Sequence, residues 1–183
     1  MSNRVESSVR PKYQRQFYPP IRHLAAIGAV AAAWTMIEST MELTILGLYE
    51  IDQGRGLVLT NNIGFPARLS LLRILASEGA IADKDRALEM LEILKRIEAA
   101  YGDRNALLHG LWAKGDKPGV IRRLALRTRK NKLQTYAEDF TADQLWDVVE
   151  RMRSLEIEFA DLAARSFVWE KLESATRHST APK

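Results

Sequence analysis

The sequence predicts an all-α fold, in which long helices form a bundle and a small β-hairpin or extended insertion precedes the last of them. Along four segments, apolar residues recur in steps of three and four, the spacing of one helix face. The segments between the first helices gather glycine, proline and asparagine, which interrupt helices. A later segment alternates polar and apolar residues in places, as strands do. The 183 residues are enough for one ordinary domain with a single core.

The first predicted helix covers residues 21–50 and follows Pro19-Pro20. Its apolar stripe consists of Ile27, Val30, Trp34, Ile37, Met41, Ile45 and Leu48. The basic start and the small residues at 31–33 also imitate a signal peptide. However, a discarded peptide has no reason to share a stripe with the sequence after it, and no uncharged run reaches the roughly 18 residues of a membrane span. We therefore expect a cytoplasmic protein without a membrane partner.

Two further helices are expected before residue 102. Residues 50–66 hold three glycines and two asparagines and are predicted to be a loop. Pro66 suits a first helical position, and Gly79 marks the end of that second helix. The third helix begins at Asp83, and its buried face is predicted to contain Ala87, Met90, Leu94, Ile97 and Tyr101.

The hairpin is expected at residues 119–140 and the last helix after it. Thr141 and Gln144 have the spacing of a capping box, so the fourth helix should begin there and continue to about Trp169. Its core face is predicted to contain Leu145, Val148, Val149, Met152, Leu155, Phe159 and Leu162. The domain organisation is then a polar arm at 1–20, a helical domain at 21–171 with a basic insertion at 114–138, and a flexible tail at 172–183.

Composition excludes several kinds of site. The chain has no cysteine, which removes disulfides, thiolate zinc sites and cysteine nucleophiles. Its three histidines, His23, His109 and His178, do not have the spacing of metal ligands. The sequence therefore predicts neither a metal nor a cofactor.

The net charge of +4 is unevenly distributed. From 114 to 132 there are eight Lys or Arg and one acid, whereas residues 138–173 hold ten acids and four bases. Such a basic arm either contacts an RNA backbone, in which case binding falls with salt, or is only a solvated hairpin. Under the first interpretation, the RNA-binding residues are Arg122, Arg123, Arg127, Arg129, Lys130 and Lys132.

The strongest candidate for chemistry is Arg104-Asn105-Ala106-Leu107-Leu108-His109. RNA cleavage without a metal needs a base for the 2′-hydroxyl proton and a cation that stabilises the phosphate as charge develops. An imidazole titrates near neutrality, and a guanidinium binds two phosphate oxygens at once. His109 and Arg104 have these two properties, and Asn105 would position one of them.

The same run resembles the Arg-Asn-x-x-x-His signature of the HEPN superfamily, all-helical domains that include metal-independent RNases of toxin and defence systems. The helix layout is similar over about residues 21–170, including a first helix with Trp34 and Glu38. The resemblance implies that Arg104 and His109 are the catalytic pair, that Asn105 is the polar residue that commonly follows the arginine, and that both subunits of a homodimer build the site. An antitoxin or inhibitor protein is a further possible partner.

Helical geometry adds an expectation about assembly. At about 100° per residue, Arg104 and His109 diverge by roughly 140° on one helix, so one helix should not direct both to one phosphate. Two helices that meet across a two-fold axis would do so. Alternatively, Gly102 breaks the third helix and Asp103 caps a new one, which places Arg104 in a first turn that attracts anions. The small residues Ala25, Ala29, Ala32 and Ala33 widen the apolar face of the first helix and also favour a dimer.

Structural roles are the alternative for each site residue. Arg104 lies on the apolar lattice and would pair with Glu38 or another acid at the core edge. His109 before Gly110 would simply be the last helical residue. Glu38 would orient His109, act as a second acid or base, or form a structural ion pair. The competing function is therefore a non-catalytic helical module that binds RNA or a protein and keeps the motif for packing.

Overall fold

The computed structural model describes residues 18–51, 56, 58, 60, 62–129 and 132–166, with side chains outside residues 126–135. Four helices are α2 (Ile21–Leu48), α4 (Phe65–Ser77), α5 (Lys84–His109) and α6 (Ala142–Arg165). Three strands lie between α5 and α6: β1 (Leu111–Lys114), β2 (Val120–Arg129) and β3 (Lys132–Thr141). The fold is therefore mostly helical, as predicted, with a small antiparallel sheet.

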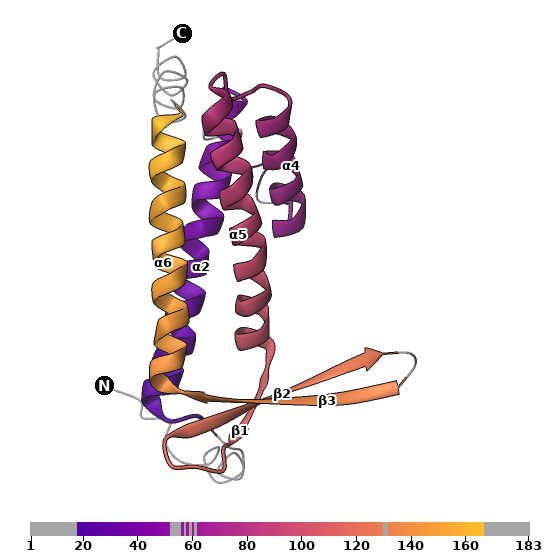
Figure 1. Cartoon of the computed structure of the whole chain (residues 1–183), viewed down its shortest axis with the longest axis vertical. Helices are drawn as coiled ribbons and strands as arrows, with labels where there is room; N and C mark the ends of the chain where they lie inside the picture. Colours follow the sequence, from indigo (N-terminus) through magenta and orange to yellow (C-terminus); the bar gives the residue numbers. More distant parts are fainter. Residues whose placement is uncertain are drawn as a thin grey trace, which may run out of the picture.

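The helices form a bundle with the sheet at one end (Figure 1). The long helices α2 and α6 run in the same direction and α5 runs opposite to both, while the shorter α4 covers only the half of α5 that is far from the sheet. The strands pair in the order β1-β2-β3, and the β2–β3 hairpin extends sideways beyond the helices. The end of α5 therefore lies at the junction of bundle and hairpin.

The predicted apolar stripes form the core. All seven predicted core residues of the last helix are buried, as are Met90, Leu94 and Ile97 of α5. In the middle of the bundle, the ring of Trp34 lies 5.0 Å from that of Phe65 and 5.6 Å from that of Tyr101. Within the described residues, α2 is the one helix long and apolar enough to cross a membrane, and its packing against α4, α5 and α6 places it in this core.

The predicted helix starts are confirmed. The Thr141 hydroxyl accepts a hydrogen bond from the Gln144 backbone N–H at 3.2 Å, and the Gln144 side chain accepts one from the Thr141 N–H at 2.8 Å. Asp83 caps α5 by accepting from the backbone N–H groups of residues 85 and 86. The end of α6 is Arg165, while the predicted end at Trp169 lies outside the described residues.

Two sequence predictions about local structure are wrong. The first is the loop at 50–66, because Gly56, Val58 and Thr60 are helical. The Thr60 hydroxyl donates to the Gly56 carbonyl at 3.2 Å, and a Cβ at Gly56 would lie 2.2 Å from a methyl carbon of Leu46. Close packing against α2 thus makes use of the glycine and overrides its low helix propensity.

The second wrong prediction is the alternative helix break at Gly102. Helix α5 continues without interruption from Lys84 to His109, so Asp103 is not a cap and Arg104 is not in a first turn. Tertiary packing of the apolar stripe, which continues to the buried Leu107, outweighs the helix propensity lost at one exposed glycine.

Candidate functional site

The motif residues meet at the last turn of α5. The Arg104 Nη1 atom donates a hydrogen bond to Asn105 Oδ1 at 2.8 Å and lies 3.3 Å from His109 Nε2. One chain therefore brings Arg104 and His109 together, and the expectation that a single helix cannot do so is wrong. The 140° argument describes where side chains leave the helix, but the arginine side chain is long enough to reach around to the imidazole.

The contact orients the imidazole. A guanidinium has only donors, so a hydrogen bond between Arg104 and His109 requires Nε2 to accept, in the tautomer that carries its proton on Nδ1. In that tautomer the basic nitrogen of His109 is directed toward Arg104. His109 itself is exposed and is the last residue of α5, as its structural alternative predicted.

Arg104 has no carboxylate partner among the described side chains. Its Nη1 atom contacts Asn105 and His109, while its Nε atom is buried with no hydrogen-bond acceptor among the described residues. Among the described residues, the Nη2 atom of Arg104 also has no hydrogen-bond acceptor. Pairing with Glu38 is therefore not observed, and no described carboxylate compensates the charge of the guanidinium.

A hollow of about 470 Å³ adjoins this cluster, within the size range of small-ligand sites. It lies where α5, β1 and β2 meet. Its lining residues are Gly102, Asn105, Ala106, His109, Gly110, Leu111, Arg123, Leu124 and Ala125. The imidazole and the Asn105 side chain thus face an open space that is large enough for a ligand.

Arg123 fixes β2 against the end of α5. One of its guanidinium nitrogens donates to the Ala106 carbonyl at 3.4 Å and the other pairs with Glu138 at 2.6 Å. Gly110 permits this approach, because a Cβ there would lie 2.7 Å from both the Ala106 oxygen and Arg123 Cγ. Arg123 thereby places a positive charge at the helix C-terminus, where carbonyl groups lack intrahelical partners.

Arg122 is held by two carboxylates. It contacts Asp139 at 2.6 Å and Asp116 at 2.6 Å. The hydrogen bond from Arg122 lowers the pKa of Asp139, and the bonds to Asp139 and then Asp116 raise the pKa of Arg122. Two of the predicted RNA-binding arginines, Arg122 and Arg123, are therefore neutralised within the chain. The others, Arg127, Arg129, Lys130 and Lys132, lie outside the described side chains.

Glu38 does not join the cluster. It lies half-buried on α2, one turn after Trp34, and Trp34 contacts Tyr101, which precedes the motif. None of the described side chains hydrogen-bonds or ion-pairs with Glu38, so neither an orienting contact with His109 nor a structural ion pair is observed. No described group of three or more potential ligands could hold a metal ion.

His23 has a structural role that the sequence did not indicate. It is buried, and its Nε2 atom lies 3.1 Å from the Gly119 carbonyl in the turn between β1 and β2. This contact joins the start of α2 to the sheet. Gly119 has a φ of +75°, a conformation that glycine adopts without strain. Nothing in the basic sequence around Gly119 indicates that its carbonyl would contact His23.

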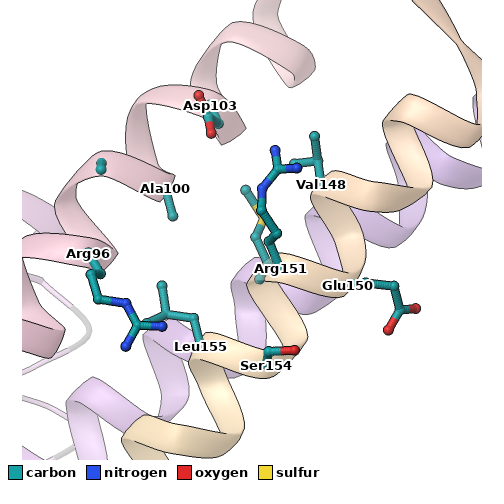
Figure 2. A pocket seen from close by; sticks show the side chains of 10 residues that line it. Arg96, Ala100, Asp103, Val148, Glu150, Arg151, Ser154 and Leu155 are labelled. Atoms are coloured by element: carbon teal, nitrogen blue, oxygen red, sulfur yellow. The ribbon is translucent and has the colours of Figure 1, made fainter.

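A second groove, of about 480 Å³, lies between α5 and α6 (Figure 2). There the Arg151 side chain extends from α6 toward the turn of α5 that carries Asp103. A smaller hollow of about 140 Å³ shares Asp103 and Arg151 with this groove, and Ala106 and Arg123 with the hollow at His109. Concave surface therefore follows α5 from the middle of the bundle to the motif.

No family model, curated protein or solved structure matches the chain.

Proposed function

We propose that the protein is a metal-independent endoribonuclease that cleaves single-stranded RNA by attack of the 2′-hydroxyl. The observation that carries this proposal is the 3.3 Å contact between Arg104 Nη1 and His109 Nε2 beside an open hollow. The imidazole of His109 and the guanidinium of Arg104 are close enough to contact the same phosphate group. No described carboxylate pairs with either of them. The HEPN-like motif supports the same reaction.

The cluster can supply the first chemical step from its own atoms. A phosphodiester at Arg104 would engage the guanidinium and release His109 Nε2 from its hydrogen bond. Nε2 then takes the 2′-hydroxyl proton while the 2′-oxygen forms a bond to phosphorus. The bond from phosphorus to the 5′-oxygen breaks, that oxygen receives a proton from solvent, and a 2′,3′-cyclic phosphate remains. Arg104 stabilises the charge on the phosphate, and Asn105 orients the guanidinium through its Oδ1.

The test is cleavage of unstructured and structured RNA by the purified protein in excess EDTA. We expect products that end in a 2′,3′-cyclic phosphate, and a loss of at least about a hundredfold in rate for His109→Ala, the low end for removal of a general base. His178→Ala is the control, because it removes a histidine from the predicted tail and should leave the rate unchanged. Absence of cleavage by folded protein, or cleavage that survives His109→Ala, would refute the proposal.

A non-catalytic RNA- or protein-binding module is the second candidate function. The ion pairs of Arg122 and Arg123 favour its protein-binding form, because they remove two cations from a phosphate-binding surface. If Arg104 and His109 only stabilise the fold, then Arg104→Ala and His109→Ala should lower the melting temperature by several degrees and change no RNA assay. If the two residues are catalytic, the alanine variants should lose activity, and their melting temperature should be equal to or higher than that of the wild type.

The cellular setting follows from the same proposal. A ribonuclease of this kind would act in the cytoplasm as a toxin or defence factor and would require an inhibitor protein in the uninfected or unstressed cell. A small gene co-transcribed with this one, whose product blocks cleavage in the EDTA assay, is the expected finding.

A further inference from the structure

The outer face of α6, beside α2, carries a stripe that none of the described helices or strands covers. Trp146, Glu150, Arg153 and Ile157 follow one another in steps of four, three and four, so they share one side of the helix. Trp146 is 37% exposed and Ile157 is 64% exposed, although both are large and apolar. The core residues of α6 lie on the opposite side of the helix. The residues from Trp146 to Ile157 on the outer side therefore form a second stripe, separate from the core stripe.

An apolar groove continues from this stripe onto α2. It has a volume of about 600 Å³ and lies between the two parallel helices. Its lining residues are Ala29, Ala32, Ala33, Met36, Trp146, Val149, Arg153, Glu156 and Ile157. Met36 is 55% exposed, and the three alanines allow another surface to approach α2 closely. A face of this kind on a water-soluble bundle is typical of an interface.

The charges on the stripe identify what fits it. The four residues are symmetric about the midpoint between Arg151 and Met152: Trp146 and Ile157 lie equally far from it, and so do Glu150 and Arg153. When two copies of such a helix pack antiparallel about a two-fold axis, each residue faces its mirror position on the other copy. Trp146 would then face the partner's Ile157, and Glu150 would face the partner's Arg153.

We propose that a second copy of this chain binds this face, in a two-fold dimer with α6 antiparallel to the partner's α6. The spacing of four, three and four is also that of alternating a and d positions in a coiled coil, where a residues pack against d residues of an antiparallel partner. Within one chain, Arg153 already lies 3.5 Å from Glu150. The dimer would join two such pairs into a network of four alternating charges, flanked by the tryptophan and isoleucine contacts.

This dimer leaves the candidate catalytic cluster outside the interface. The hollow at His109 is lined by α5, β1 and β2, whereas the stripe and its groove are formed by α2 and α6. No residue lines both cavities. The interface therefore differs from the sequence prediction, which placed the Arg104-to-His109 region at or near the two-fold axis, and it does not depend on ribonuclease activity.

The first test is sedimentation velocity of the full chain over a range from about 0.1 to 100 µM, bracketing a micromolar Kd. The wild type should convert from monomer to dimer within this range. Ile157→Asp should remain monomeric throughout. Leu88→Asp is the matched control, because Leu88 is 65% exposed on α5 and the same change should leave the dimer intact. Far-UV circular dichroism and the melting temperature show that each variant is folded.

The second test uses the predicted charge pairing. Glu150→Arg and Arg153→Glu each place like charges opposite one another and should weaken the dimer at least tenfold. The double variant Glu150→Arg/Arg153→Glu restores opposite charges and should return the dimer Kd to within threefold of the wild type. Arg151→Glu, on the same helix but with its side chain directed toward α5, should have no effect. A monomeric wild type, a dimer that Ile157→Asp leaves unchanged, or a double variant weaker than both single variants would overturn the proposal.

Discussion

The end of α5 and the start of the hairpin both carry arginine, but their guanidinium groups have different partners. At the end of α5, Arg104 contacts the amide of Asn105 and the imidazole of His109. On β2, Arg122 contacts two carboxylates. The hairpin has more positive charge in the sequence, yet among Arg104, Arg122 and Arg123 only Arg104 has no carboxylate partner within the described side chains. Partners, rather than the number of basic residues, decide where an anion such as RNA phosphate can bind.

Exchanging the two arginines for glutamine tests this contrast most strongly. Arg104→Gln should lower the rate of RNA cleavage by about a hundredfold to a thousandfold, the range for loss of one group that stabilises a transition state. Arg122→Gln should change the rate by less than threefold, since its charge is already compensated. Single-turnover rates in EDTA provide the measurement, and equal losses for the two variants would contradict the contrast.

Mixing inactive chains tests whether one chain holds the complete cluster. Arg104→Ala and His109→Ala protein, combined and allowed to exchange subunits, should recover no more than a few per cent of the wild-type rate, because no chain then has both side chains. A composite site from two subunits would instead recover a quarter or more at statistical mixing. Exchange is verified by labelling the two proteins with different fluorophores.

The junction of the two regions is the next place to alter. Gly110→Ala should reduce the free energy of unfolding by about 1–3 kcal/mol, because the new Cβ collides with the Ala106 carbonyl and the Arg123 side chain. Gly102→Ala is the matched control on the same helix. A Cβ at Gly102 meets nothing within 4 Å, so this change should stabilise the helix by about 0.5–1 kcal/mol. Urea denaturation measures both, and equal effects would show that the junction is not tightly packed.

The smallest expected effect is on acid sensitivity. The pKa of Asp139 is lowered in the folded state by Arg122, so this pair stabilises the fold above the unfolded-state pKa and loses its contribution as the pH falls through the acidic range. Arg122→Gln should therefore reduce the fall in melting temperature between pH 6 and pH 3, by a small amount because both groups are exposed. Arg22→Gln, which alters the looser and exposed pair with Asp143, is the control. An unchanged pH profile in Arg122→Gln would refute this role for the pair.

The helices could be predicted because each has a regular stripe and a recognisable start. Thr141 with Gln144, and Asp83, mark the starts of α6 and α5 in the sequence as they do in the structure. The helical turn at Gly56 could not be predicted in this way, because its stability depends on the contact with Leu46, which the local composition does not show. The four residues of β1 are too few for an alternation pattern to identify a strand.

The candidate site was predicted in its residues but not in its geometry. The chemistry of the motif identifies Arg104, Asn105 and His109. Their contact could not be predicted from the angle between Arg104 and His109 around the helix axis, because that angle takes no account of the length of the arginine side chain. The pairing of Arg122 with Asp139 depends on the hairpin register. Pairing of Arg129 with Lys132 places Arg122 opposite Asp139 and Arg123 opposite Glu138. The contact of Arg123 with Ala106 had no signal in the sequence, because it depends on how the finished sheet docks on α5.

The central claim is that Arg104 and His109 activate an RNA 2′-hydroxyl without a metal. The most direct measurement compares an all-ribo oligonucleotide with a copy that has a single 2′-deoxy substitution at the mapped cleavage site, both in excess EDTA. We expect cleavage of the first at that site with a 2′,3′-cyclic phosphate end, and no cleavage of the second there. Equal cleavage of the two at that position, or none of either by folded wild-type protein, would contradict it.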